Sequence, residues 1–277
     1  MSSSEFSWQN KDGLNIYAQD WKPDGSIRGA VALVHGLGEH AGRYQHVAQA
    51  LNQAGYAMTG FDLPGHGRSG GTRGHASYDG IVTDIDRLLA EVQKRYPGVP
   101  VFLYGHSLGG ALVLYYTLKC QPKLAGAIVT SPGLATGTPL PASKLLMAKV
   151  MARLAPAFTL DNGLDVSNLS HDPEIAKMYK ADPLVHPRIS ARLGLDLLTR
   201  GAWIQAHAAE LSIPLLLEQG SDDYLVSPPA TAAFAQAAPT DKVTFKVWQG
   251  LFHETHNEVE KKQVLQFMID WLNQQTA

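Results

Sequence analysis

The sequence predicts an α/β fold in which a mostly parallel sheet is flanked by helices and carries an inserted helical cap. Apolar runs typical of strands buried on both faces occur at residues 30–34, 56–61, 101–104 and 126–130, and helical patterns separate them. Between residues 134 and 200 prolines interrupt helical patterns and no convincing strand is found. Because the alternation then resumes, the middle segment is expected to be an insertion into one domain.

The remaining elements complete this plan. Residues 14–21 alternate apolar and polar side chains and predict an antiparallel edge strand after an opening hairpin. Two late strands are expected at residues 214–220 and 243–247. Helices are expected at residues 43–53, 78–96, 230–237 and 258–272.

The composition is that of an ordinary globular protein. The 277 residues are 45% hydrophobic and 17% charged, and 23 basic against 25 acidic residues give a net charge of −2. This balance argues against nucleic acid as a partner. Cys120 is the only cysteine, which excludes an intrachain disulfide, and its apolar neighbours predict a position in the core.

No targeting or membrane-spanning pattern is visible. The first residues lack the basic segment and apolar segment of a secretory signal. No apolar run reaches the length of a transmembrane helix. We therefore expect a cytoplasmic protein.

The motif Gly-His-Ser-Leu-Gly at residues 105–109 supplies the candidate nucleophile. It follows a predicted strand and precedes a helical run at residues 111–118, the arrangement that exposes a reactive serine on a sharp turn. Gly105 and Gly109 suit such a turn because backbone is pressed against backbone there. The bare pattern can arise by chance, but the flanking strand and helix favour Ser107 as a nucleophile.

A serine hydroxyl needs a base to remove its proton and a carboxylate to orient that base. In this architecture the acid and then the histidine follow the serine, each beyond a late strand. Asp222 and Asp223 directly follow one such strand, and His253 follows the last. His256 lies three residues further on and is the alternative base.

Two backbone donors should stabilise the oxyanion of an acyl-transfer reaction. The N–H after the nucleophile is that of Leu108, and the second comes from the loop after an earlier strand. Residues 35–38, His-Gly-Leu-Gly, form that loop, and Leu37 is the preferred donor. Neither zinc-binding spacings nor nucleotide fingerprints occur, so no metal and no cofactor is expected.

With these residues assembled, the chain resembles the α/β-hydrolase superfamily and, within it, the monoacylglycerol lipase and lysophospholipase group of serine aminopeptidase-type hydrolases. The motifs are HGLGEHAGRY at 35–44, GHGRS at 65–69, GHSLGG at 105–110, YKADPL at 179–184, GSDD at 220–223 and HETH at 253–256. The first and fourth motifs are typical of a much narrower group of proteins than the whole superfamily. The resemblance implies an α/β-hydrolase fold with an eight-stranded sheet, a core of residues 1–133 and 201–277, and a cap of residues 134–200.

The resemblance implies a serine ester hydrolase that cleaves monoacylglycerols through an acyl-enzyme on Ser107. Asp223 and His253 would complete the triad, and Leu37 and Leu108 would be the oxyanion donors. A lysophospholipase or a broad-specificity carboxylesterase is the alternative. A non-catalytic binding protein on the same fold is a distant one.

The resemblance further maps the glycerol-binding residues onto Glu39, Arg43 and His256. A polyol offers hydroxyls to which a carboxylate and a guanidinium can bind. The simpler interpretation of Glu39 and Arg43 is an ion pair across one helical turn.

An apolar stripe in the cap, residues 145–154, has two interpretations. It packs onto the core, or it lines an acyl channel and touches a membrane or lipid droplet. The predicted partner is a small lipid ester, and the oligomeric state is not predicted.

Overall fold

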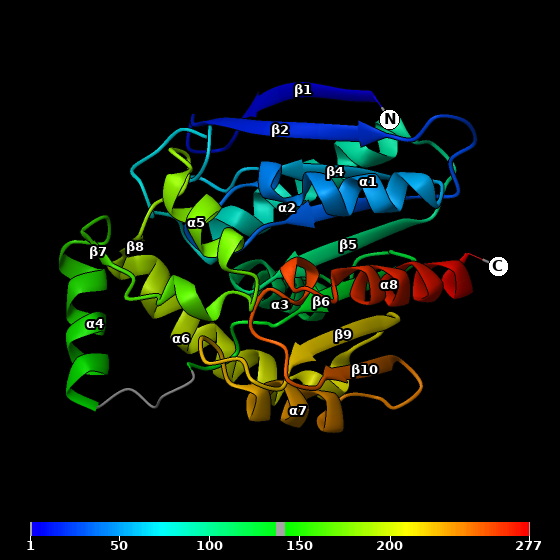
Figure 1. Cartoon of the computed structure of the whole chain (residues 1–277). Coiled ribbons are helices and arrows are strands. Elements are labelled where there is room, and N and C mark those ends of the chain that lie inside the picture. Colours follow the sequence, from blue (N-terminus) through cyan, green and yellow to red (C-terminus); the bar gives the residue numbers. More distant parts are fainter. Residues whose placement is uncertain (1, 137–141, 277) are drawn as a thin grey trace.

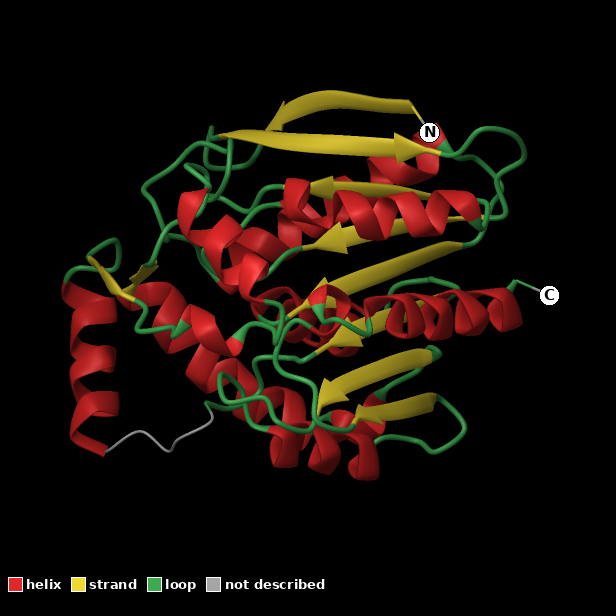
Figure 2. Ribbon diagram, in the orientation of Figure 1, coloured by secondary structure: helices red, strands yellow, loops and turns green. Residues whose placement is uncertain are grey.

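In the described residues, eight strands form one sheet with helices on both faces (Figures 1 and 2). The structure is a computed structural model that describes residues 2–136 and 142–276. In their order across the sheet the strands are β1 (Ser2–Gln9), β2 (Asn15–Lys22), β4 (Tyr56–Phe61), β3 (Gly29–Val34), β5 (Val101–His106), β6 (Gly126–Thr130), β9 (Leu215–Gly220) and β10 (Val243–Trp248).

The sheet is parallel from β4 to β10, and β2 pairs antiparallel with both β1 and β4. The predicted fold class is therefore confirmed. The prediction that residues 14–21 form an edge strand is wrong, because β1 pairs along β2 and is itself the edge.

Each face of the sheet has its own core. Helices α1 (Gln45–Gln53) and α8 (Lys261–Gln275) cover one face, where Phe102 packs edge-on against Trp271. Helices α2 (Tyr78–Arg95), α3 (Leu108–Cys120) and α7 (Pro228–Ala237) cover the other. Short 3₁₀ helices lie at Ala41–Tyr44, Val166–Asn168, Ala208–Glu210 and Thr255–Asn257.

Cys120 does not lie in the core. It is exposed at the end of α3, where the last turn emerges from the packed part of the helix. The prediction from its apolar neighbours is wrong because Gln121 immediately ends the helix with a left-handed backbone, φ 45°.

Between β6 and β9, where we expect the cap, lie α4 (Ala142–Leu154), α5 (Pro173–Ala181) and α6 (Ala191–Ala206), with α4 standing away from the sheet (Figure 1). This segment also contains an antiparallel pair, β7 (Thr159–Asp161) and β8 (Arg188–Ser190). The sequence predicted no strand here, because three residues are too few for a periodic pattern. Helix α6 contacts α3 and α7 as well as α4, so it links this segment to the helices that cover the sheet. Pro139 and Pro141 lie outside the described residues.

Candidate active site

Ser107 occupies a strained turn between β5 and α3. Its backbone has φ 56° and ψ −118°, a conformation that non-glycine residues rarely adopt. A Cβ at Gly105 would lie 2.3 Å from the Gly109 carbonyl oxygen, and one at Gly109 would lie 2.0 Å from the Val34 carbonyl oxygen. Both glycines are therefore required for the strand, the helix and the turn to approach this closely.

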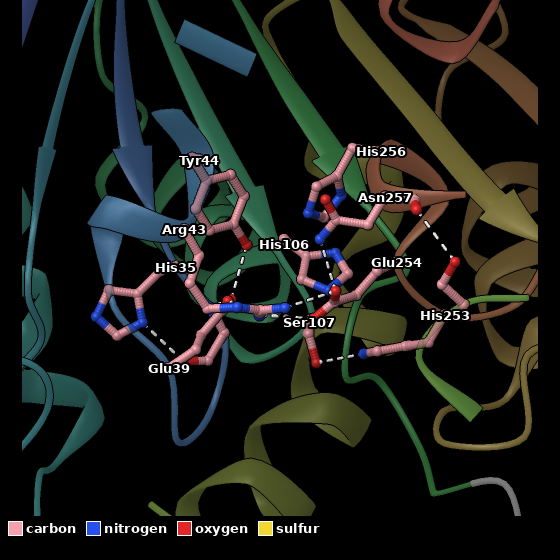
Figure 3. Close-up of polar contacts among 12 residues, drawn as sticks. His35, Glu39, Arg43, Tyr44, His106, Ser107, His253, Glu254, His256 and Asn257 are labelled. Atoms are coloured by element: carbon pink, nitrogen blue, oxygen red, sulfur yellow. Dashed lines mark hydrogen bonds and ion pairs between the residues drawn. The ribbon is translucent and has the colours of Figure 1, made fainter. Parts of the chain in front are cut away.

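A hydrogen-bonded chain joins Ser107, His253 and Asp223. His253 Nε2 lies 2.9 Å from Ser107 Oγ, and His253 Nδ1 lies 2.8 Å from Asp223 Oδ2; Figure 3 shows the Ser107 contact. Because an ionised carboxylate only accepts hydrogen bonds, Nδ1 carries the proton and Nε2 accepts from the serine hydroxyl. The arrangement can draw the proton from Ser107 as its oxygen attacks a carbonyl.

The alternative acid and base lie elsewhere. Asp222 is exposed, and its carboxylate accepts from the Ser221 hydroxyl at 2.6 Å. The His256 ring is buried, stacked on Tyr44 at 5.0 Å between centroids and packed against His106 at 4.8 Å. Burial lowers the pKa of His256 to about 3, so this imidazole stays neutral.

The charges around His253 suit a general base. Burial alone would lower the pKa of His253, but the Asp223 carboxylate, helped by Glu254 and Glu39, raises it. Burial alone would raise the pKa of Asp223, and its contact with His253 lowers it. An ionised Asp223 therefore stabilises the imidazolium that forms when Ser107 loses its proton.

A small cavity of about 20 Å³ lies beside Ser107. Leu37 lines it on the loop after β3, where the neighbouring Gly36 N–H already donates to Glu39 Oε1 at 2.6 Å. Leu108 is the first residue of α3, and the first N–H groups of a helix have no partner within it. The cavity has room for about one water molecule, so any acyl ester needs its walls to move.

A buried ion-pair cluster adjoins the cavity. Arg43 donates from Nη1 and Nη2 to the two carboxylate oxygens of Glu254, at 2.7 and 2.8 Å, and also pairs with Glu39. Glu39 Oε1 accepts in addition from the Tyr44 hydroxyl at 2.7 Å. The Arg43 guanidinium lies against the face of the Tyr179 ring, with Cζ 4.8 Å from the ring centroid. Figure 3 shows this cluster next to Ser107.

Glu254 is the charged member of this cluster to which the sequence assigned no role. Its signal is its place in the HETH motif directly after His253, whereas its partner Arg43 lies 211 residues away. Burial alone would raise the pKa of Glu254, but the Arg43 guanidinium lowers it to about 2. The pair thus fixes the segment that carries His253 against the loop after β3.

The structure separates the three residues expected to bind glycerol. Glu39 lines the cavity, and Arg43 lies behind it in the ion-pair cluster. His256 is buried behind Tyr44 and His106, away from the cavity wall. Among the described residues, no group of three or more His, Cys, Asp or Glu side chains could hold a metal ion.

The profile of the family described as Serine aminopeptidase, S33, matches residues 25–260. The chain belongs to this hydrolase family. It is 35% identical to a monoacylglycerol lipase of Mycolicibacterium smegmatis over 97% of this chain and 96% of that protein. An uncharacterized abhydrolase domain-containing protein of Dictyostelium discoideum is 34% identical over 99% of this chain, which spans only 29% of its length.

The solved structures agree. The crystal structure of Paleococcus ferrophilus monoacylglycerol lipase superposes with a TM-score of 0.87 and 35% identity, covering 94% of this chain and 99% of that chain. The predicted membership of the α/β-hydrolases and the monoacylglycerol lipase resemblance are therefore confirmed. The family and these relatives make the chain an ester hydrolase of EC 3.1.1 type.

Proposed function

We propose that the protein cleaves monoacylglycerols through an acyl-enzyme on Ser107. His253 takes the Ser107 proton as Oγ attacks the ester carbonyl, and Asp223 holds the imidazole in place. The N–H groups of Leu37 and Leu108 receive the oxyanion. His253 then protonates the departing glycerol oxygen, and water attacks the acyl-enzyme in a second, equivalent step. The hydrogen-bonded chain Asp223–His253–Ser107 is the observation that carries this proposal.

Glu39 is the proposed contact for the alcohol half of the substrate. Its carboxylate lines the cavity next to Ser107 and accepts from Gly36 N–H, the Tyr44 hydroxyl and Arg43. Since two oxygens offer about four acceptor positions, one remains for a glycerol hydroxyl. Arg43 then acts by holding Glu39, and His256 by packing behind Tyr44.

The charge of this wall favours a neutral head group. Glu39 and Glu254 both line the cavity, and Arg43 pairs with both. Two carboxylates against one guanidinium leave a surplus negative charge beside the ester. A phosphodiester would meet repulsion there, so a monoacylglycerol is preferred over a lysophospholipid.

The acyl half requires the cap to open, and the cap carries apolar side chains on its outside. Leu146, Met147 and Leu154 of α4 are exposed, Leu154 to 76%. In the part of the chain that the structure describes, no helix has the length and apolarity to cross a bilayer. We propose that α4 contacts a lipid surface peripherally, where the acyl chain enters.

The test compares the wild type with Ser107→Ala on monoolein, lysophosphatidylcholine and a short p-nitrophenyl ester. Monoolein should give the highest kcat/KM, and Ser107→Ala should lose hydrolysis of all three and labelling by a fluorophosphonate probe. Hydrolysis by folded Ser107→Ala would overturn the mechanism. A preference for lysophosphatidylcholine would overturn the substrate.

A further inference from the structure

The side chain of Gln219 lies directly behind the proposed triad acid and is fully buried. Its Nε2 donates to Asp223 Oδ2 at 2.9 Å, the same oxygen that accepts from His253 Nδ1. The other oxygen, Asp223 Oδ1, accepts from the N–H groups of Leu225 and Val226 at 2.9 and 3.1 Å. Four donors thus converge on one carboxylate. Two of these donors are side chains. His253 takes part in the proposed proton transfer from Ser107, and Gln219 does not.

The orientation of the Gln219 amide follows from its partners. Nε2 faces two acceptors, Asp223 Oδ2 and the Gly220 carbonyl at 3.2 Å, so the NH₂ group must lie on that side. On the other side Oε1 accepts from the Thr231 hydroxyl at 2.9 Å. Thr231 is fully buried on α7. The hydroxyl therefore holds the amide with its donor toward Asp223, and α7 is linked to the site.

We infer that Gln219 is a positioning residue for ester hydrolysis, which fixes the Asp223 carboxylate and shares its negative charge, with Thr231 setting the direction of the amide. This inference rests on the proposed role of Ser107, His253 and Asp223. A neutral amide suits the position because it donates without adding a charge. A carboxylate there would place two like charges in contact inside the protein.

Loss of the Gln219 donor favours the protonated form of His253. The titratable and charged groups that face it are Asp223 after β9, His106 at the end of β5, Glu39 after β3, and Glu254 and His256 of its own segment. Among these groups, removing the Gln219 donor acts directly only on Asp223. It leaves the Asp223 anion with three donors instead of four, so the anion accepts more strongly from Nδ1–H and the imidazolium is favoured.

Gln219→Met removes the donor and keeps nearly the same volume. We expect kcat to fall about tenfold, the lower end for loss of a hydrogen bond to a charged group, with KM unchanged. The acid limb of kcat/KM against pH should move to higher pH. Thr231→Val removes the hydroxyl that directs the amide and should produce a smaller change of the same sign. Thr231→Ser retains the hydroxyl and should restore the wild-type profile.

Gln205→Met is the matched control, because Gln205 Nε2 donates to the Ala230 carbonyl of α7 at 2.7 Å and not to Asp223. It should lower the melting temperature without moving the acid limb. If Gln219→Met has a wild-type kcat, or an acid limb that stays in place or moves down, the inference is wrong. Ser107→Ala keeps the two proposals distinct: an active Ser107→Ala overturns the triad, whereas a wild-type-like Gln219→Met overturns only the role of Gln219.

Discussion

Arg43 and Glu254 form a bidentate ion pair, with Nη–Oε distances of 2.7 and 2.8 Å, between segments 211 residues apart. Arg43 follows the loop that provides Leu37, and Glu254 follows His253. One pair of side chains therefore holds the loop of the proposed oxyanion donor and the proposed base in a fixed relation. Asn257 adds to this by donating to Glu254 Oε2 at 2.6 Å.

Glu254→Gln should lower the free energy of unfolding by about 3 kcal/mol, because it leaves the buried Arg43 with one carboxylate instead of two. The pKa of Glu254 is held near 2 in the folded protein, below its unfolded value. Its stabilisation is therefore complete above about pH 5 and is lost as pH falls towards 2. Urea unfolding at pH 7 and pH 4 measures both effects. Between pH 7 and pH 4 the variant should lose less free energy of unfolding than the wild type. Glu174→Gln, in an exposed pair with Lys177, is the control; equal losses in the two variants would contradict the prediction.

Asp223→Asn should lower kcat by about 10⁴-fold, as in Ser-His-Asp enzymes generally, because an amide donor faces Nδ1 and selects the wrong tautomer. In the wild type the raised pKa of His253 means that kcat/KM falls as pH drops through a value above about 6.5. Removing the Asp223 charge should move this limb to lower pH. Steady-state rates between pH 5 and 9 test both statements. Asp222→Asn should behave as wild type, and a large loss there would reassign the acid.

Two helical glycines should respond in opposite ways to alanine. In α3, a Cβ at Gly109 would lie 2.0 Å from the Val34 carbonyl, so Gly109→Ala should destabilise the protein by about 3 kcal/mol and displace Ser107. In α6, a Cβ at Gly194 would meet only the Ile189 side chain at 3.6 Å, so Gly194→Ala should stabilise by about 0.5 kcal/mol. Thermal unfolding and fluorophosphonate labelling of both variants decide the matter. A stable, fully labelled Gly109→Ala protein would refute the account of the turn.

Replacing Leu146, Met147 and Leu154 together by serine should weaken binding to phosphatidylcholine vesicles at least about tenfold, because each removes apolar area that lies outside the folded core. Hydrolysis of a short water-soluble ester should stay unchanged. Val259→Ser, which alters an exposed apolar residue next to α8 in the sequence, should leave binding intact. Vesicle co-sedimentation is the measurement, and an undiminished triple variant would exclude α4 as the contact.

Local sequence patterns predicted most of the scaffold correctly. The apolar runs of β3, β4, β5 and β6 are strands buried at every position, and the glycines around Ser107 match the close approaches at Gly105 and Gly109. The same reasoning missed β7 and β8, whose three-residue strands carry no periodicity. It also predicted that Cys120 lies in the core, because apolar neighbours do not show where a helix ends and leaves the packed interior.

The sequence by itself determined the order of the main-sheet strands and their helices, the family, and the position of Ser107 on its turn, because these depend on patterns that can be read along the chain. Only the tertiary structure brought Asp223 rather than Asp222 to His253 and placed His256 behind Tyr44. It also brought Glu254 to Arg43 and Gln219 to Asp223. Those relations depend on side-chain direction and on contacts between distant strand ends. The physical reason is that a parallel sheet gathers its carboxyl ends at one edge, while packing and burial select which side chains meet there.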